Sequence, residues 1–193
     1  MNTTASARKA VIVAIFAILA IAVTPIISYA APEGYILPFA GRLNISTGPR
    51  CFLHYGYNAE AIDFSGPWNY AIRASKSGVA YFNWESVGGN VVKMYHSDGL
   101  ISTYAHLSGY EPNKYWAYRN TGNNGIWVNQ GDVIGYMGNS GSGATGVHLH
   151  FAVHDRYGNP IRVHDMPGMV WNDGNPWDSG CVMNNRPEGY AQR

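Results

Sequence analysis

The segment Val147-His148-Leu149-His150-Phe151-Ala152-Val153-His154 carries the clearest strand pattern in the chain. Successive side chains of a β-strand point to opposite faces of a sheet, so His148 and His150 project to one side while Leu149 and Phe151 project to the other. The apolar side chains can then pack a core, and the two imidazoles face one common space. The pattern predicts a half-buried strand over residues 147–154.

The segment Leu100 to Leu107 shows a similar alternation. By the same parity Ser102, Tyr104 and His106 share one face, and the intervening residues can pack the other face. If the two strands belong to one sheet, three histidines converge. Tyr104 is then a candidate for holding a substrate beside His106.

The remainder of the chain predicts a mainly β fold. The chain has 23 glycines, and further alternating segments near residues 79–84, 90–96 and 133–137 are separated by turn dipeptides, including a tight hairpin at Asp98-Gly99. We expect a single antiparallel β-sheet domain with long loops around a groove. Residues 109–127, rich in aromatic side chains, are expected to form a long loop that makes one wall of this groove, and residues 165–193 an irregular tail.

The N-terminus has the layout of a secretory signal. Arg8 and Lys9 precede an apolar run of 14 residues from Ala10 to Val23, with small residues near Ala30. As a helix this run covers about 21 Å, short of a hydrocarbon core of about 30 Å, so a retained anchor is the less favoured alternative. We predict a signal peptide over 1–30, a single domain over 31–193 with its motif-bearing core at about 50–164, and a secreted, extracellular or cell-wall protein that meets the membrane only during export.

Charge and cysteine usage narrow the function classes. Removing residues 1–30 takes away two positive charges, which leaves 11 basic against 12 acidic residues and a net charge of −1. A near-neutral domain argues against a nucleic-acid partner, and we expect a monomer. Cys51 and Cys181 are the only cysteines, and export favours a disulfide between them over two buried free thiols.

A metal site can be assembled from separated segments. His54 and Asp63 lie upstream of the His148-Leu149-His150 triplet. Together with one histidine of the triplet they form a set of two nitrogens and one oxygen, which leaves a fourth tetrahedral position for water, as catalytic zinc requires. The triplet alone is weak evidence, because short motifs recur by chance.

At four blocks the sequence resembles the lysostaphin, LytM and LasA type zinc endopeptidases, which hydrolyse peptidoglycan. The blocks are His54 to Ser65, Ala71 to Val79, Leu100 to Leu107 and Val128 to Phe151, the last including Gly138-Asn139-Ser140-Gly141 and His148-Leu149-His150. The resemblance spans about residues 54–154. It implies the lysostaphin-type peptidase fold and a zinc ion (Zn2+) as cofactor.

The resemblance also implies a role for each site residue. His54, Asp63 and His150 would bind zinc, whereas His106 and His148 would be catalytic. Eight residues separate His54 from Asp63, where the most familiar members have three, as in the longer spacings of LasA-like relatives. The chain has no His-Glu-x-x-His motif to supply a glutamate base, so His106 or His148 must take the proton of the water, and the sequence leaves open which one does so.

The expected function is that of a secreted zinc endopeptidase that hydrolyses stem or cross-bridge peptides of peptidoglycan. The alternatives are a non-enzymatic wall-binding or hydrolase-activator protein, and a zinc DD-carboxypeptidase, although enzymes of that kind end their site on a Glu and a Trp-His pair. We expect Gly138 to Gly146 to form the turn that delivers His148 to the cleft. Outside the site, we expect Glu60 to be solvated and His96, His154 and His164 to be turn or surface residues.

Overall fold

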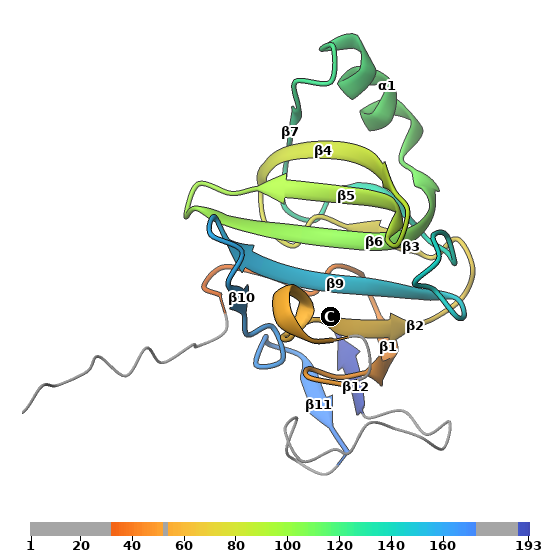
Figure 1. Ribbon diagram of the computed structural model, residues 1–193, viewed down its shortest axis with the longest axis vertical. Coiled ribbons are helices and arrows are strands. Elements are labelled where there is room, and N and C mark those ends of the chain that lie inside the picture. The colour runs from red at the N-terminus through yellow and green to blue at the C-terminus, as the bar shows by residue number, and fades with distance from the viewer. Residues whose placement is uncertain (1–31, 52–53, 173–188) are drawn as a thin grey trace, which may run out of the picture.

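The computed structural model describes residues 32–51, 54–172 and 189–193 (Figure 1). Strands dominate these residues. They are β1 (Arg42–Thr47), β2 (Ile62–Ser65), β3 (Ala71–Arg73), β4 (Gly78–Glu85), β5 (Gly89–Tyr95), β6 (Leu100–Tyr110), β7 (Ile126–Val128), β8 (Val133–Met137), β9 (His148–Asp155), β10 (Pro160–Ile161), β11 (Met169–Trp171) and β12 (Gly189–Gln192). The helical elements are a 3₁₀ turn, η1 (Gly56–Asn58), and one α-helix, α1 (Pro112–Asn120).

The strands form one sheet in which every pairing among the described residues is antiparallel. Its main order is β11-β12-β1-β2-β9-β6-β5-β4-β7, while β10 pairs with β9, and β8 pairs with β3 and β6. The predicted antiparallel β domain is therefore confirmed. β9 lies between β2 and β6 near the middle of the molecule (Figure 1), so the His148-Leu149-His150 triplet is held by a strand on each side.

The core lies on one face of this sheet, and the predicted alternation of β9 is confirmed. Leu149, Phe151 and Val153 are at most 1% exposed, and Phe151 pairs across the sheet with Tyr104, whose ring centroid is 5.3 Å away. Full burial of a Leu or Phe side chain contributes about 1.5–3 kcal/mol. This packing fixes the register of β9, and it thereby fixes the direction in which His148 and His150 project.

Residues 109–127 do not form a long loop, because β6 continues to Tyr110, α1 occupies Pro112–Asn120 and β7 begins at Ile126. The side chain of Glu111 accepts a hydrogen bond of 2.8 Å from the Lys114 backbone N–H, and Pro112 occupies the first turn. Both features favour a helix start. The helix buries only Tyr118, against Phe82 of β4, so it has no apolar stripe by which the sequence could have revealed it.

The parts of the C-terminal tail that the structure describes contain two strands, β11 and β12, contrary to the expectation of an irregular tail. β12 pairs with both β1 and β11. Residues 173–188 lie outside the described part of the chain, and they include Cys181, so the disulfide with Cys51 stays a prediction. The predicted signal peptide also lies outside the described residues. Among the residues that are described, none belongs to a helix long and apolar enough to cross a membrane.

Candidate metal centre and active site

The pairing of β2 with β9 places a carboxylate beside a histidine. Asp63 lies opposite His150, and Ser65 lies opposite His148, so these side chains share the face that is turned away from the core. Asp63 Oδ1 lies 2.9 Å from His150 Nδ1, and Asp63 Oδ2 lies 3.9 Å from His148 Nε2. The strand register therefore brings both histidines of the triplet to one carboxylate.

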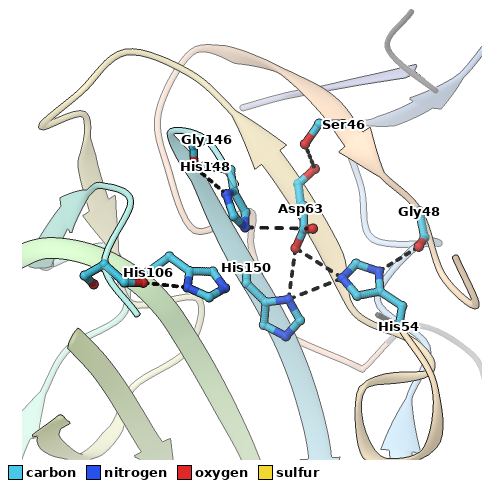
Figure 2. Close-up of polar contacts among 9 residues, drawn as sticks. Ser46, Gly48, His54, Asp63, His106, Gly146, His148 and His150 are labelled. Carbon is cyan, nitrogen blue, oxygen red and sulfur yellow. Dashed lines mark hydrogen bonds and ion pairs between the residues drawn. The ribbon is translucent and has the colours of Figure 1, made fainter. Parts of the chain in front are cut away.

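His54 completes a cluster of three possible ligands. Its ring is 3% exposed, and its Nδ1 donates a hydrogen bond of 2.7 Å to the Gly48 carbonyl. Its Nε2 atom lies 3.2 Å from Asp63 Oδ1 and 3.3 Å from His150 Nδ1 (Figure 2). One atom from each of the three residues lies within 4.8 Å of the others, an arrangement that could hold a metal ion.

The carboxyl group in this cluster favours its ionised form. Burial alone would raise the pKa of Asp63, but the interactions of its carboxylate with the His150 and His54 rings outweigh burial and hold this pKa far below its usual range. An anionic Asp63 flanked by two imidazoles has the charge and donor types that suit a divalent metal with nitrogen and oxygen ligands.

A bulge in β6 brings His106 to the same face. The register of β5 against β6 shifts between the pairs Asn90–Leu107 and Val92–Tyr104, which leaves one extra residue in β6. His106 has a φ of 62°, and its backbone N–H bonds the Gly88 carbonyl at 2.7 Å. Extra residues of this kind redirect a side chain. Ala105 pairs with His150 and therefore shares its face of the sheet. Strict alternation would place the next residue, His106, on the opposite face, but the bulge turns it toward the site.

Tyr104 does not share the face of His106, so the predicted substrate contact is wrong. Its side chain is fully buried on the core side. Its hydroxyl bonds the Ser75 hydroxyl at 2.7 Å and accepts from the Ser102 hydroxyl at 3.0 Å. The parity argument failed here because it assumed an unbroken strand through residue 106.

His106 and His148 lie side by side, with their ring centroids 4.6 Å apart. His106 Nδ1 donates to the Ser140 carbonyl at 2.9 Å, and His148 Nδ1 donates to the Gly146 carbonyl at 2.8 Å (Figure 2). A carbonyl can only accept, so each neutral ring carries its proton on Nδ1 and a lone pair on Nε2. Burial lowers the pKa of His106 to about 4, although the hydrogen bond to Ser140 acts in the opposite direction.

The glycine-rich loop between β8 and β9 supplies both carbonyls, and the prediction that it delivers His148 is confirmed. Gly138 bridges to His148, and the loop packs against the β4–β5 turn. A Cβ built on Gly141, whose φ is 82°, would lie 2.3 Å from the Gly89 backbone nitrogen. Only glycine permits this approach, which keeps the Ser140 carbonyl over His106.

The cleft extends to both sides of the ligand cluster. One pocket, of about 590 Å³, is lined by Ser46, Thr47, Ser65 and the loop residues 143 and 145–147; the other, of about 200 Å³, is lined by η1 residues and side chains of β4 to β6. His54, Asp63 and His148 border both. No residue of 109–127 lines either pocket, and α1 lies beyond β4 and β7 in Figure 1, so the prediction that this segment forms a groove wall is wrong.

The model of the family described as Peptidase family M23 matches residues 57–163, more than half of the chain. The chain belongs to peptidase family M23. This M23 domain is 35% identical over 105 residues to the DD-carboxypeptidase/endopeptidase Mpg of Neisseria meningitidis and to that of Neisseria gonorrhoeae. The match covers 53% of the chain but 22% of Mpg, so the chain spans about a fifth of the length of these relatives.

A solved structure of a peptidase M23 shows the same fold as this M23 domain. The crystal structure of a peptidase M23 from Pseudomonas aeruginosa superposes with a TM-score of 0.53 at 22% identity, over 73% of this chain and 53% of that one. The catalytic domain of lysostaphin from Staphylococcus simulans gives a TM-score of 0.45 at 26% identity, over 60% and 80% of the respective chains. The family model that matches residues 57–163 confirms the family resemblance that the four sequence blocks indicated.

Four polar residues of the M23 domain that were expected to be solvated, or to lie in turns or at the surface, are buried, so the expected exposure is wrong, although His96 and His164 do lie at turns. They are Glu60, His96, His154 and His164, which are at most 7% exposed. Glu60 pairs with Arg50 at 3.0 Å, and His154 Nε2 donates to the Tyr57 carbonyl at 2.7 Å while its ring stacks on that of Tyr57. Buried polar groups persist where they find such partners. Local sequence did not reveal the burial of Glu60 and His154, because their partners come from other segments, whereas His96 bonds Ser102 only six residues away.

The sequence also gave no indication of the carbonyls that orient the site histidines. Gly48, Ser140 and Gly146 act through backbone oxygen. Every residue carries such an oxygen, so only the fold could identify these three.

Proposed function

We propose that this M23 protein is a zinc-dependent endopeptidase that hydrolyses peptide bonds in the stem or cross-bridge peptides of peptidoglycan by means of a metal-activated water. One observation carries the proposal. His54, Asp63 and His150 converge on one point, and His106 and His148 stand beside that point in the same cleft. Family membership and the name of the Mpg relatives support it.

The donor set fits zinc. Because His54 Nδ1 donates its hydrogen to Gly48, the neutral ring directs a lone pair from Nε2 toward His150 Nδ1, 3.3 Å away. Two nitrogens and a carboxylate oxygen leave a fourth position for water, as in catalytic zinc sites. The Gly48 carbonyl orients the His54 ring by accepting a hydrogen bond from Nδ1, the ring nitrogen that would not bind the metal. When bound, zinc would polarise the scissile carbonyl and lower the pKa of a bound water to about 7.

The remaining chemistry belongs to the paired histidines. A neutral imidazole can accept a proton at Nε2, and one of the pair would take the proton of the attacking water in this way. The ring that has taken this proton then carries it on Nε2, from which it can pass to the leaving amine. The other ring would hold the developing oxyanion only in its protonated form, because Nε2 of the neutral ring has no hydrogen to donate. Both rings have their orientation fixed by carbonyls on one loop, so the pair is preorganised for proton transfer whichever ring is the base.

The shape of the cleft favours cleavage within a peptide. The 590 Å³ and 200 Å³ pockets meet at His54, Asp63 and His148. A substrate lying across the cluster can therefore continue beyond both sides of the bond to be cut. A carboxypeptidase needs only a short pocket on one side, and this difference supports the endopeptidase.

The proposal includes export. A wall-directed peptidase must reach its substrate outside the membrane, and the N-terminal segment of residues 1–30 has the pattern of a signal peptide. We therefore propose that the protein acts at the cell wall or in the extracellular space.

The test uses the purified chain from residue 31 onward. We expect about one zinc per chain by elemental analysis, and new amino termini in purified peptidoglycan. Mass spectrometry of the fragments then names the bond and separates endopeptidase from carboxypeptidase products. A zinc-loaded protein that released nothing from walls of different peptide composition would overturn the proposal in favour of a binding or activator role.

A further inference from the structure

The two halves of the cleft differ in charge. Apart from Asp63 of the ligand cluster, the larger pocket is lined by neutral side chains, mostly small and hydroxylated. The smaller pocket contains Lys93 of β5 and Glu85 of β4, together with Tyr57 and Thr103. Lys93 and Glu85 are thus charged groups that border the cleft without belonging to the cluster of site residues.

The register of the sheet sets the distance of Lys93 from the cluster. Lys93 pairs with Thr103, and Thr103 pairs with Ala152, in a row across the sheet. The row that contains His150 lies two residues further along, on the same face. Two residues of strand span about 7 Å, and β5 lies two strands from β9, which adds about 10 Å across the sheet. The backbone of Lys93 is therefore about 12 Å from that of His150, and a substrate extended from the cluster toward Lys93 would reach its ammonium with a side chain about three residues from the scissile bond.

Lys93 is held in place and charged. Its Nζ lies 2.7 Å from Glu85 Oε1, and 29% of the Lys93 side chain and 42% of the Glu85 side chain are exposed. Burial lowers the pKa of Lys93, but the hydrogen bond from Lys93 to Glu85 outweighs this and raises it. The Thr103 hydroxyl beside the pair is buried, and its polar neighbour is the Tyr57 side chain.

We propose that Lys93 determines specificity by binding a carboxylate that the substrate carries about three residues from the scissile bond. Glu85 positions the ammonium when no substrate is present. A bound carboxylate would accept from Lys93 Nζ, and an oxygen of it would also accept from the Thr103 hydroxyl at the edge of the same pocket. This inference rests on the proposed peptidase function, and it selects stem peptides with free carboxylates over uncharged glycine bridges.

The test compares cross-linked stem-peptide dimers that differ only in whether the carboxylates near the cross-link are free or converted to primary amides. For the protein as it exists, we expect kcat/KM to be higher on the free acid. In Lys93→Met the ratio of kcat/KM between acid and amide should fall about tenfold, mostly through KM, since a hydrogen bond to a charged group is lost. Lys93→Arg should retain the preference.

Glu85→Gln gives an effect of opposite sign. It removes the competitor for Lys93 and should increase the preference for the acid. Lys114→Met is the matched control, because Lys114 is also paired, at 3.3 Å with Asp132, but borders neither pocket. It should leave the acid-to-amide ratio unchanged.

The outcomes separate this inference from the proposed function. Cleavage of both dimers with no preference, or with a preference that Lys93→Met does not reduce, would overturn the carboxylate site and leave the peptidase intact. Failure of the native protein to cleave either dimer or any peptidoglycan would overturn the peptidase itself, and the inference with it.

Discussion

His106 and His148 present the same nitrogen to the cleft, although they come from different strands and their backbones differ. The rings lie 4.6 Å apart, and each donates from Nδ1 to a carbonyl of the loop between β8 and β9. In His106 this orientation depends on a bulge and a φ of 62°. In His148 it follows from regular alternation. One loop therefore determines which nitrogen of each neutral ring carries the hydrogen. The first prediction concerns these two rings.

Replacing either ring should stop hydrolysis without removing the metal. His106→Ala and His148→Ala each remove a proton-transfer group that is not among the three converging ligands, so we expect kcat to fall by about 10²–10⁴-fold. Zinc content and amino-terminus release would be measured on the same samples. Residual hydrolysis close to that of the native protein in either variant would remove that histidine from the proposed mechanism.

Substitutions within the ligand cluster should instead reduce the binding of the metal. Asp63→Asn and His54→Ala each leave two of the three converging atoms, so metal affinity should fall. A ligand present at about 100 times its Kd stabilises a protein by about 2.7 kcal/mol. Adding zinc to chelated native protein should therefore raise Tm, with little effect in these variants. His148→Ala is the control, since it should respond as the native protein does; an unchanged zinc response in Asp63→Asn would contradict the assignment.

The contact between Gly89 and Gly141 offers a test of how the loop supports His106. A Cβ at Gly141 would lie 2.3 Å from the Gly89 nitrogen, whereas Gly99, with a similar φ of 81°, has nothing within 4 Å. Alanine at Gly99 should cost about 1–2 kcal/mol from backbone conformation alone. Gly141→Ala should cost more and also lower kcat, because the Ser140 carbonyl must move. Equal unfolding free energies and equal kcat in the two variants would show that the close approach is unimportant.

The sequence was sufficient where a feature depended on local alternation. The strand near 147–154 and its two faces were predicted from parity, and β8 was placed at 133–137 as the structure has it. The ligand cluster could be assembled from residue types, because zinc chemistry limits the possible donors. The location of His54 against Gly48 could not, because that contact depends on where a loop folds back.

The failures have physical causes that local patterns do not contain. Tyr104 was assigned to the site because a bulge at His106 breaks the period of two. Glu60 and His154 were assigned to the surface because their partners, Arg50 and Tyr57, lie on other segments. Burial of a polar group is decided by such tertiary partners, and charge or polarity alone predicts the opposite.

Tyr104→Phe distinguishes a core role from a substrate role. The hydroxyl bonds the backbone N–H and hydroxyl of Ser75 and the hydroxyl of Ser102, all in the interior. Its removal leaves buried donors unsatisfied, which costs about 1–3 kcal/mol of unfolding free energy, while kcat/KM at a temperature below the transition should not change. Tyr157→Phe, at a tyrosine that is 75% exposed, should change neither quantity. A lower kcat/KM in Tyr104→Phe with unchanged stability would restore the substrate role.

The last prediction concerns acid sensitivity and the buried ring of His154. Burial lowers its pKa to about 4, with Lys93 acting in the same direction and the Tyr57 carbonyl and Asp155 acting against it. In the unfolded chain a histidine has a pKa of about 6.5. Between these values the unfolded chain binds the proton and the folded chain does not. The stability that the neutral ring contributes is therefore complete above about pH 6.5 and is lost as the pH falls toward 4.

From pH 7.5 to pH 5.0 this difference in proton binding amounts to about 2 kcal/mol of unfolding free energy. Urea unfolding of the chelated protein at both pH values would measure it, with chelation excluding any contribution from metal loss. His154→Phe can still stack on Tyr57, but it removes both the titration and the hydrogen bond to the Tyr57 carbonyl. The variant should thus be less stable than the native protein at pH 7.5, yet lose about 2 kcal/mol less on acidification. If both proteins lost the same amount, the acid sensitivity would belong to other groups, such as His106, whose pKa burial also lowers to about 4.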